Sequence, residues 1–164
     1  SAGFITGSQA YQPTPIPLVM IHFFILQNRQ GQTRIAKWYS SFEHEEKKKL
    51  QSEIYRTLIQ RPSKYTNFVE FRNYTLVYRR YKGVFFTICC DPSDNEMAML
   101  EAIHLFVECL DDYFVDVCEL DLVFGFYKVF ALLDEFFLAG ELQESSKKVI
   151  LARMNYLAEV EKKA

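Results

Sequence analysis

The segment from Thr66 to Cys90, TNFVEFRNYTLVYRRYKGVFFTICC, constrains the fold more than any other part of the chain. It contains three runs rich in aromatic and β-branched residues, at Phe68–Phe71, Tyr74–Tyr81 and Val84–Cys90. The pairs Arg72-Asn73 and Lys82-Gly83 separate these runs as hairpin turns would. Both alternating faces of the third run are apolar, so we expect an antiparallel meander whose last strand is covered on both sides.

The length and charge of the chain fit one domain without a general affinity for polyanions. A chain of 164 residues buries enough surface for a real core. Its 19 basic and 21 acidic residues give a net charge of −2, which argues against non-specific binding to nucleic acid or anionic lipid. The apolar run Leu120–Leu138 contains four charged residues, so we interpret it as a core element rather than a membrane span.

The four cysteines show no C-x-x-C spacing and lie within apolar runs, at Cys89, Cys90, Cys109 and Cys118. We therefore expect small buried side chains in a reducing compartment, and no zinc site.

Residues 1–19 differ in composition from the rest. They carry three prolines and two glycines without helical or strand periodicity, and they lack the basic and apolar regions of a signal peptide. We expect a flexible extension or a cloning remnant here, with Met20 as the natural start and the folded domain at 20–160.

The rest of the chain alternates between strand and helix patterns. Strands are predicted at Ile21–Leu26 and Thr33–Tyr39. A helix with Leu50, Ile54 and Leu58 on one face follows, and Pro62 ends it. A capping box of Ser40 and Glu43 is one candidate for its start.

Three more helices are predicted after the meander. The first has its apolar face between Leu100 and Phe114, and the second spans Glu119–Leu138 with Gly140 as its stop. The third is capped by Ser145 or Ser146 and carries Ile150, Met154 and Leu157. The order β-β-α-β-β-β-α-α-α predicts an α/β fold of the α+β type. Its five-stranded antiparallel sheet has the first helix on one face and the later helices on the other.

No catalytic or metal-binding pattern is present. The histidines His22, His44 and His104 lie on different predicted elements without nearby ligands, and glycine-rich phosphate motifs do not occur. Glu101 and Glu108 fit a solvated helix face. We therefore expect neither an enzyme nor a cofactor.

The pair Arg79-Arg80, flanked by Tyr78 and Tyr81, has two interpretations. One is a platform that stacks single-stranded nucleic acid, but this requires an open sheet face. The other, which we favour, is that the arginines pair with acidic groups of a partner or cover a sheet edge. We expect no nucleic-acid partner.

Six motifs between Met20 and Leu157 resemble the small (sigma) chain of the heterotetrameric clathrin adaptor complexes. They are QNRQGQTRIAKWY, TNFVEFRN, YRRY, LEAIH followed by FVE, VCELDLVF and DEFFLAGE. The forms QNR, NFVEFRN, EAIH and FYKV look more like the plasma-membrane endocytic complex, whereas SSKK at 145–148 looks more like the trans-Golgi complex.

This resemblance implies a longin-like fold and a function without catalysis. The implied direct partner is the trunk of a large adaptin chain, within a heterotetramer that also holds another large chain and a medium chain. Dileucine-containing cargo tails would bind the complex, which would meet clathrin and the membrane only indirectly. The implied location is cytoplasmic, at clathrin-coated pits of the plasma membrane. The alternatives are a purely structural assembly subunit and the small chain of the trans-Golgi adaptor complex.

The resemblance also implies a site for acidic dileucine signals, D/E-x-x-x-L-L/I. Arg34 matches the basic residue that faces the acidic side chain of the signal. The apolar positions that line the leucine pockets are matched by Val84, Val107, Val117 and Leu122. Lys82 and Asp116 depart from the usual alanine and asparagine at this site. Lys82 would either point outward over the rim or narrow the pocket, and Asp116 would weaken acidic ligands unless Lys82 or Arg34 offsets it.

Overall fold

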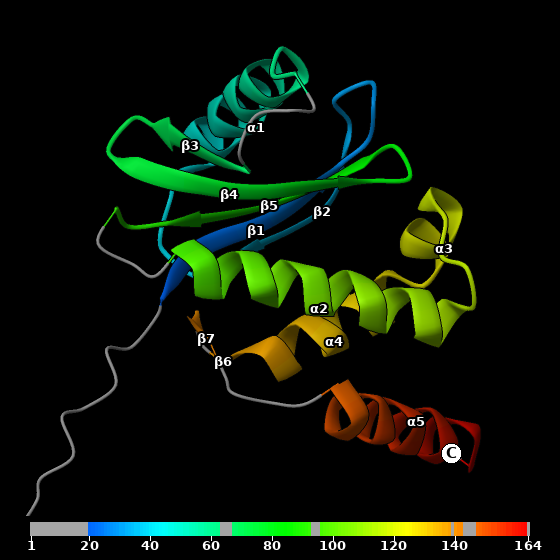
Figure 1. Ribbon diagram of the computed structural model, residues 1–164. Coiled ribbons are helices and arrows are strands. Elements are labelled where there is room, and N and C mark those ends of the chain that lie inside the picture. Colours follow the sequence, from blue (N-terminus) through cyan, green and yellow to red (C-terminus); the bar gives the residue numbers. More distant parts are fainter. Residues whose placement is uncertain (1–19, 63–66, 93–95, 139, 143–146, 164) are drawn as a thin grey trace, which may run out of the picture.

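A five-stranded antiparallel sheet forms the centre of the computed structural model, which describes residues 20–62, 67–92, 96–138, 140–142 and 147–163 (Figure 1). The strands follow the order β2-β1-β5-β4-β3, and every neighbouring pair is antiparallel. Their bounds are β1 Ile21–Gln27, β2 Thr33–Trp38, β3 Phe68–Phe71, β4 Tyr74–Tyr81 and β5 Val84–Cys90. The predicted five-stranded sheet is confirmed, and so is the meander β3-β4-β5.

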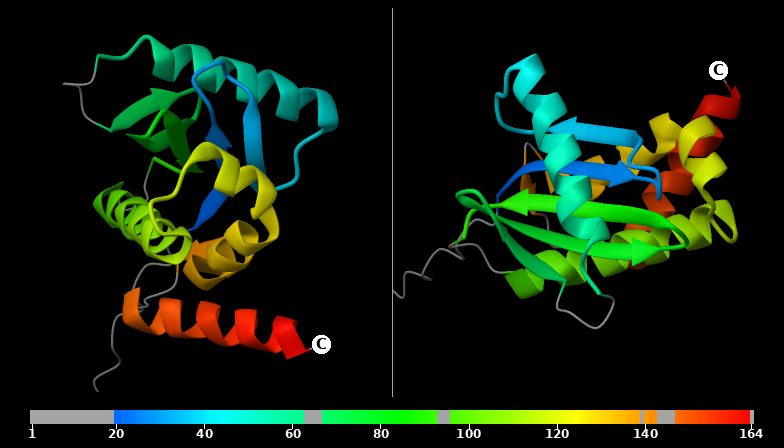
Figure 2. Two further views of the ribbon diagram at one scale, coloured as in Figure 1. Left: turned by 90° about the vertical axis from the view of Figure 1, so that its right-hand side faces the viewer. Right: turned by 90° about the horizontal axis from the view of Figure 1, so that it is seen from above.

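Helices cover both faces of this sheet. The bounds of the main four are α1 His44–Ile59, α2 Glu96–Phe114, α4 Phe126–Phe136 and α5 Lys147–Lys163. Helix α1 lies on one face, whereas α2 and α4 lie on the other and α5 packs against them (Figure 2). The predicted layers are confirmed. A nucleic-acid platform on either sheet face is thereby excluded for the part of the chain that the structure describes.

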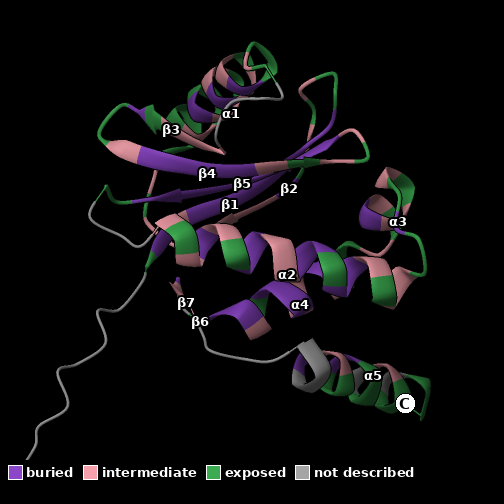
Figure 3. Cartoon of the chain, in the orientation of Figure 1, coloured by how far each residue is buried: buried purple, intermediate pink, exposed green. Residues whose placement is uncertain are grey.

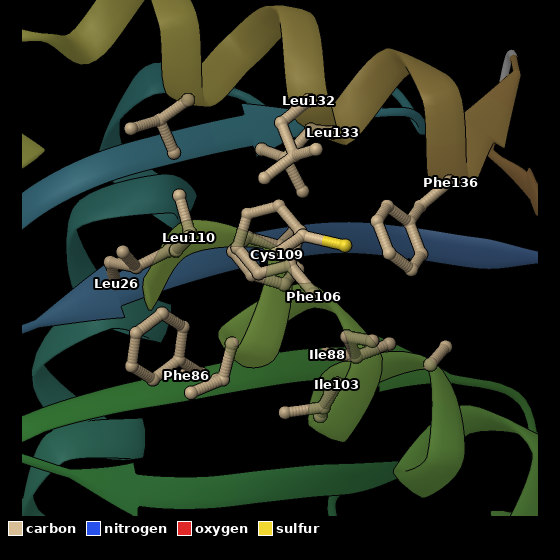
Figure 4. Close-up of a cluster of buried hydrophobic side chains, with 14 of the residues drawn as sticks. Leu26, Phe86, Ile88, Ile103, Phe106, Cys109, Leu110, Leu132, Leu133 and Phe136 are labelled. Carbon is tan, nitrogen blue, oxygen red and sulfur yellow. The ribbon is translucent and has the colours of Figure 1, made fainter. Parts of the chain in front are cut away.

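The central strand β5 connects two hydrophobic cores. All seven of its residues are buried, as the purple strand in Figure 3 shows. Phe86 and Ile88 join the core beneath α2 and α4, which Figure 4 shows in close-up. Phe85 and Cys89 join the core beneath α1. The apolar character of both faces of this strand therefore follows from a helix layer on each side.

Helix α1 forms where its periodicity predicts it, with Leu50, Ile54 and Leu58 buried. The predicted capping box is wrong, because the helix begins after Glu43 without a side-chain cap. Ser40 instead bonds through Oγ to Nδ1 of His22 at 2.7 Å. Because the Ser40 hydroxyl bonds to a side chain of the sheet, it does not cap the helix that follows it.

The predicted single helix at Glu119–Leu138 is wrong. The chain forms α3 (Glu119–Phe124), turns at Gly125, and then forms α4. A Cβ atom at Gly125 would lie 2.9 Å from the Asp121 carbonyl oxygen and 2.9 Å from the Phe114 ring. The absence of a side chain therefore allows the close turn between the two helices.

The end of this segment also differs from the prediction. Helix α4 ends at Phe136, and β6 (Phe137–Leu138) pairs with β7 (Glu141–Leu142) in a small hairpin. Gly140, predicted as the helix stop, instead lies in the turn of this hairpin with a φ of 87°.

The cysteine prediction holds for three of the four residues. Cys89, Cys90 and Cys109 are buried, whereas Cys118 is exposed at the start of α3. The predictions for 1–19 and for the caps Ser145 and Ser146 fall outside the described residues. No helix in the described ranges has the length and apolarity needed to cross a membrane.

Candidate functional site

The site begins at the end of the sheet where two hairpin turns meet. The turns of the β1–β2 and β4–β5 hairpins lie at the same end of the sheet, next to α3 (Figures 1 and 2). Lys82 and Gly83 form the second turn with φ values of 47° and 77°, as two-residue hairpins of type I′ require. A Cβ atom on Gly83 would lie 2.6 Å from Nε of Arg29. The glycine thus allows the two turns to touch.

The apolar residues predicted to line leucine pockets come together in the core. Val84, Val107, Val117 and Leu122 belong to one hydrophobic cluster, and each exposes no more than 3% of its surface. They come from β5, α2, the α2–α3 turn and α3. Because all four are buried, a ligand side chain can reach them only after the turn or α3 moves.

The turn between α2 and α3 places Val117 in this cluster. Val115 and Asp116 adopt left-handed backbone conformations with φ values of 54° and 65°, which is costly for a β-branched residue such as valine. Val115 exposes 82% of its surface while Val117 exposes 3%. The strained pair therefore reverses the chain sharply and turns Val117 inward.

Asp111 holds this turn in place. Its carbonyl oxygen accepts the Asp116 N–H at 3.1 Å, and its carboxylate accepts the Val117 N–H at 3.1 Å. The Tyr81 hydroxyl donates to the same carboxylate at 2.8 Å. The hydrogen bond from Tyr81 is the main reason that the pKa of Asp111 lies below its usual value, and the same bond raises the pKa of Tyr81.

Asp111 is not among the residues predicted from the sequence. One signal was available, because an acidic residue near the C-terminal end of a helix opposes the helix dipole. Asp111 lies in the last turns of α2, and its partners in β4 and the α2–α3 turn explain this position.

Lys82 points outward to the acidic residues of the α2–α3 turn. Its ammonium bonds to the Asp116 carboxylate and lies 3.6 Å from an Asp111 oxygen. The bond to Asp116 is the main cause that raises the pKa of Lys82. The two departures from the family pattern thus neutralise each other. The Lys82 ammonium lies over the rim rather than within the apolar cluster.

Arg34 already has a carboxylate partner within the chain. Its Nε donates to Oε1 of Glu119 at 2.8 Å, and Nδ2 of Asn28 donates to the same oxygen at 2.9 Å. These two bonds, with Asn28 first, hold the pKa of Glu119 below its usual value. Glu119 and Asn28 are not among the residues predicted from the sequence, because the bonds of Glu119 to Arg34 and to Asn28 span 85 and 91 residues of sequence.

The α2–α3 turn and the start of α3 are therefore fastened to the sheet at two points. Lys82 holds Asp116, and Arg34 holds Glu119. The buried residues Val117 and Leu122 belong to the fastened segment. The two ion pairs add to the Asp111 hydrogen bonds that hold this segment against the apolar cluster.

The site combines buried aliphatic side chains with paired charges. No cluster of three potential metal-ligating side chains occurs among the described residues. His22 bonds to Ser40 and Asp91 at the other end of β1, away from this site.

Comparisons with known proteins agree in pointing to one family. The family model described as "Clathrin adaptor complex small chain" matches residues 20–161. The chain is 63% identical to the AP-2 complex subunit sigma of Dictyostelium discoideum over 138 residues, which cover 84% of this chain and 97% of that protein. It is 51% identical to the AP-1 complex subunit sigma-2 of the same organism over 130 residues, which cover 79% and 84%.

Structural similarity leads to the same group of proteins. The chain resembles a subunit in a homology model of the full-length AP-3 complex in a stretched open conformation, with a TM-score of 0.71 and 26% identity. The match covers 88% of this chain and 96% of that subunit.

Proposed function

Because the chain belongs to the family of clathrin adaptor complex small chains, we propose that it is the non-catalytic small subunit of the plasma-membrane adaptor complex. In this role it helps to bind acidic dileucine signals, D/E-x-x-x-L-L/I, in cargo tails during endocytosis. The higher identity to the AP-2 than to the AP-1 subunit of Dictyostelium discoideum supports the endocytic rather than the trans-Golgi form.

The observation that carries the cargo proposal is the convergence of the seven site residues. Val84, Val107, Val117 and Leu122 share one cluster, and the segment 116–119 at its border is bonded to both Lys82 and Arg34. A dileucine signal needs apolar contacts for its leucines and a cation for its acidic side chain. Groups of both kinds lie at the same end of this sheet.

The expected interaction energies favour a weak complex between the chain and a dileucine signal. Each leucine contributes about 1.5–3 kcal/mol when fully buried, and a partly solvated ion pair adds at most about 1 kcal/mol. Ordering a flexible tail and opening the α2–α3 turn offset much of this gain. We therefore expect affinities around micromolar or weaker, which a coated membrane converts to avidity.

The proposed partners are those of an adaptor heterotetramer. The trunk of a large adaptin chain contacts the small chain directly, and a second large chain and a medium chain complete the complex. Clathrin and the membrane are reached through the other chains, so the small chain works in the cytoplasm at coated pits of the plasma membrane.

A peptide-binding measurement on the assembled core tests the cargo role. Arg34→Glu places a negative charge where the signal's acid would bind, and we expect at least about tenfold weaker binding of a D/E-x-x-x-L-L/I peptide. Arg153→Glu is the matched control, since Arg153 pairs with Glu135 in the α4–α5 region. Equal affinities of wild type and Arg34→Glu would contradict the assignment.

A second candidate is a purely structural subunit. The observation in its favour is that the apolar residues are covered and both cations are already paired. A wild-type core that assembles normally but gives no detectable peptide binding would support this candidate instead.

A further inference from the structure

Glu119 occupies an anion site whose donors belong to the sheet. Nε of Arg34 and Nδ2 of Asn28 converge on one oxygen of its carboxylate, at 2.8 and 2.9 Å. Arg34 lies on β2, and Asn28 lies in the turn between β1 and β2. Glu119 comes from a different element, α3, which lies next to this turn (Figure 1). Any carboxylate that takes the place of Glu119 therefore meets the same two donors.

Asn28 is held in a fixed orientation for this contact. The residue exposes only 1% of its surface, and its Oδ1 accepts the N–H groups of Gln30 and Gln32 at 3.0 and 2.9 Å. Its Nδ2 carries two hydrogens, and it donates to the Gln32 side chain at 2.8 Å as well as to Glu119. A buried N–H group without an acceptor is unfavourable. When Glu119 leaves, the site therefore favours another anion in its place.

Helix α3 joins this anion site to the apolar cluster. Glu119 and Leu122 are three positions apart on α3, so their side chains are neighbours on one helix face. The helix has six residues, and Leu122 is the one that is buried. Leu120 and Phe124 expose 63% and 79% of their surfaces. The bonds of Glu119 and the burial of Leu122 thus act together to hold this short helix against the sheet.

The position of Glu119 couples the two halves of the cargo site. It lies between Val117 and Leu122, which expose 3% and 2% of their surfaces and cover the cluster that also contains Val84 and Val107. A leucine of a cargo signal reaches this cluster only when the segment 117–122 moves. Such a movement separates Glu119 from Arg34. The two donors are then free for the acidic side chain of the signal.

We propose that Glu119 is a specificity-determining residue of the cargo site, which keeps the leucine pockets closed until the acid of the signal replaces it at Arg34 and Asn28. The role assigned to Glu119 rests on the proposed function, since it concerns the same dileucine signals. The exchange replaces one carboxylate by another at the same donors, so the charge of the site is conserved. Two leucines without an acid must break the bonds of Glu119 and offer no replacement. Selectivity for Asp or Glu at the first position of the signal then arises from opening of the pockets as well as from attraction to Arg34.

A neutral peptide, Q-x-x-x-L-L, separates this role from simple competition for Arg34. If Glu119 only competes for Arg34, a peptide without an acid binds the wild type and Glu119→Gln equally well. If Glu119 closes the pockets, the variant makes opening easier for the neutral peptide too. We expect Glu119→Gln to tighten binding of the neutral peptide about two- to fivefold, the range that an exposed ion pair provides.

The experiment uses the assembled adaptor core and measures fluorescence polarisation of labelled E-x-x-x-L-L and Q-x-x-x-L-L peptides at constant ionic strength. Glu135→Gln is the matched control, because it removes a carboxylate that pairs with Arg153. We expect this control to change either affinity less than about twofold. Glu119→Ala is a second variant, since it also removes the neutral acceptor that glutamine could still offer to Asn28. We expect it to tighten the neutral peptide as well.

The results distinguish a failure of this role from a failure of the cargo site itself. Unaltered affinity of the neutral peptide for both Glu119 variants, with normal binding of the acidic peptide by the wild type, would overturn the role of Glu119 and leave the proposed function intact. Equal tightening by Glu135→Gln would overturn it too, because the effect would then be one of general charge. A wild-type core that binds neither peptide would contradict the proposed function, and the role of Glu119 with it.

Amide hydrogen exchange provides a measurement that does not depend on peptide affinity. Without peptide, we expect residues 117–124 to exchange faster in Glu119→Gln than in the wild type, because α3 leaves the sheet more often. Glu135→Gln should leave exchange in this segment unaltered. Equal exchange rates in the wild type and Glu119→Gln would show that Glu119 does not hold the segment closed.

Discussion

At the residue scale, the cations of the proposed cargo site are neutralised by the chain itself. Arg34 is bonded to Glu119, and Lys82 is bonded to Asp116. The acidic side chain of a cargo signal must therefore compete with an internal carboxylate for Arg34. Both ion pairs are partly exposed, so each contributes little to stability and is inexpensive to exchange.

Glu119→Gln removes the competing charge and should strengthen binding of a D/E-x-x-x-L-L/I peptide. An exposed ion pair of up to about 1 kcal/mol corresponds to a gain of about two- to fivefold. Fluorescence polarisation with the assembled core measures this change. Glu135→Gln, which frees Arg153 instead, should leave the affinity unaltered. Weaker peptide binding by Glu119→Gln would show that Glu119 organises the site rather than blocking it.

Arg34, Lys82 and Asp116 could be named from the sequence as residues of this site, but Glu119 and Asp111 could not. Arg34 and Lys82 occupy motif positions that a resemblance identifies. Glu119 and Asp111 meet their partners through contacts 85 and 30 residues apart in sequence. Such pairings depend on how two hairpins and the end of a helix are arranged in the folded chain. Local sequence patterns do not indicate that arrangement.

At the element scale, the α2–α3 turn combines backbone strain with a strong tether. Val115 and Asp116 are held in left-handed conformations, and the Asp111 carboxylate bonds to the Val117 N–H and the Tyr81 hydroxyl. The strain favours opening of the turn, while the tether opposes it. Asp111 therefore controls access to the apolar cluster beneath.

Asp111→Asn should destabilise the chain by about 1 kcal/mol near neutral pH, because charge-assisted bonds become weaker neutral ones in a half-exposed setting. The pKa of Asp111 is lowered on folding. Its contribution is thus present above the unfolded value of about 3.9 and is lost as pH falls through the folded pKa. Thermal unfolding from about pH 7 down to 3 measures this effect. The difference in Tm between the two proteins should stay constant above about pH 5 and narrow below about pH 4; a difference that grows with acid would contradict the tether.

Strands and single-faced helices were predictable from sequence, whereas the region after α2 was not. The aromatic and β-branched runs of β1 to β5 indicate strands, and the spacing of Leu50, Ile54 and Leu58 indicates the buried face of α1. The run 119–138 is apolar on all sides. This pattern fits one buried helix and two helices with exposed outer faces equally well. Gly125 decides between them through a close approach to Phe114, which only the folded chain reveals.

At the scale of the whole molecule, a group of large apolar side chains is exposed on α3 and α4. Leu120 exposes 63% of its surface, Phe124 79%, Phe126 52% and Tyr127 49%. Such neighbouring exposed side chains are typical of a subunit surface that a partner covers. We expect the large adaptin chain to cover this one.

Expressed without its partners, the chain should therefore self-associate. Phe124→Ser should shift sedimentation toward the monomer, because it removes the most exposed ring of this group without disturbing a buried contact. Val160→Ser on α5, also an exposed position, is the matched control and should have a smaller effect. A wild-type chain that sediments as a stable monomer at all concentrations would contradict this interpretation of the surface.

The distribution of exposed and buried thiols gives this chain a natural position for attaching a fluorescent label. Cys89, Cys90 and Cys109 are buried, and burial raises the pKa of the Cys89 thiol, so these groups react slowly with alkylating reagents. Cys118 is exposed between Val117 and Glu119, next to both fastened points of the α2–α3 turn. A maleimide dye can therefore be attached at this position in the unaltered sequence. The emission of the dye then reports whether the turn moves away from the sheet, in solution and in real time.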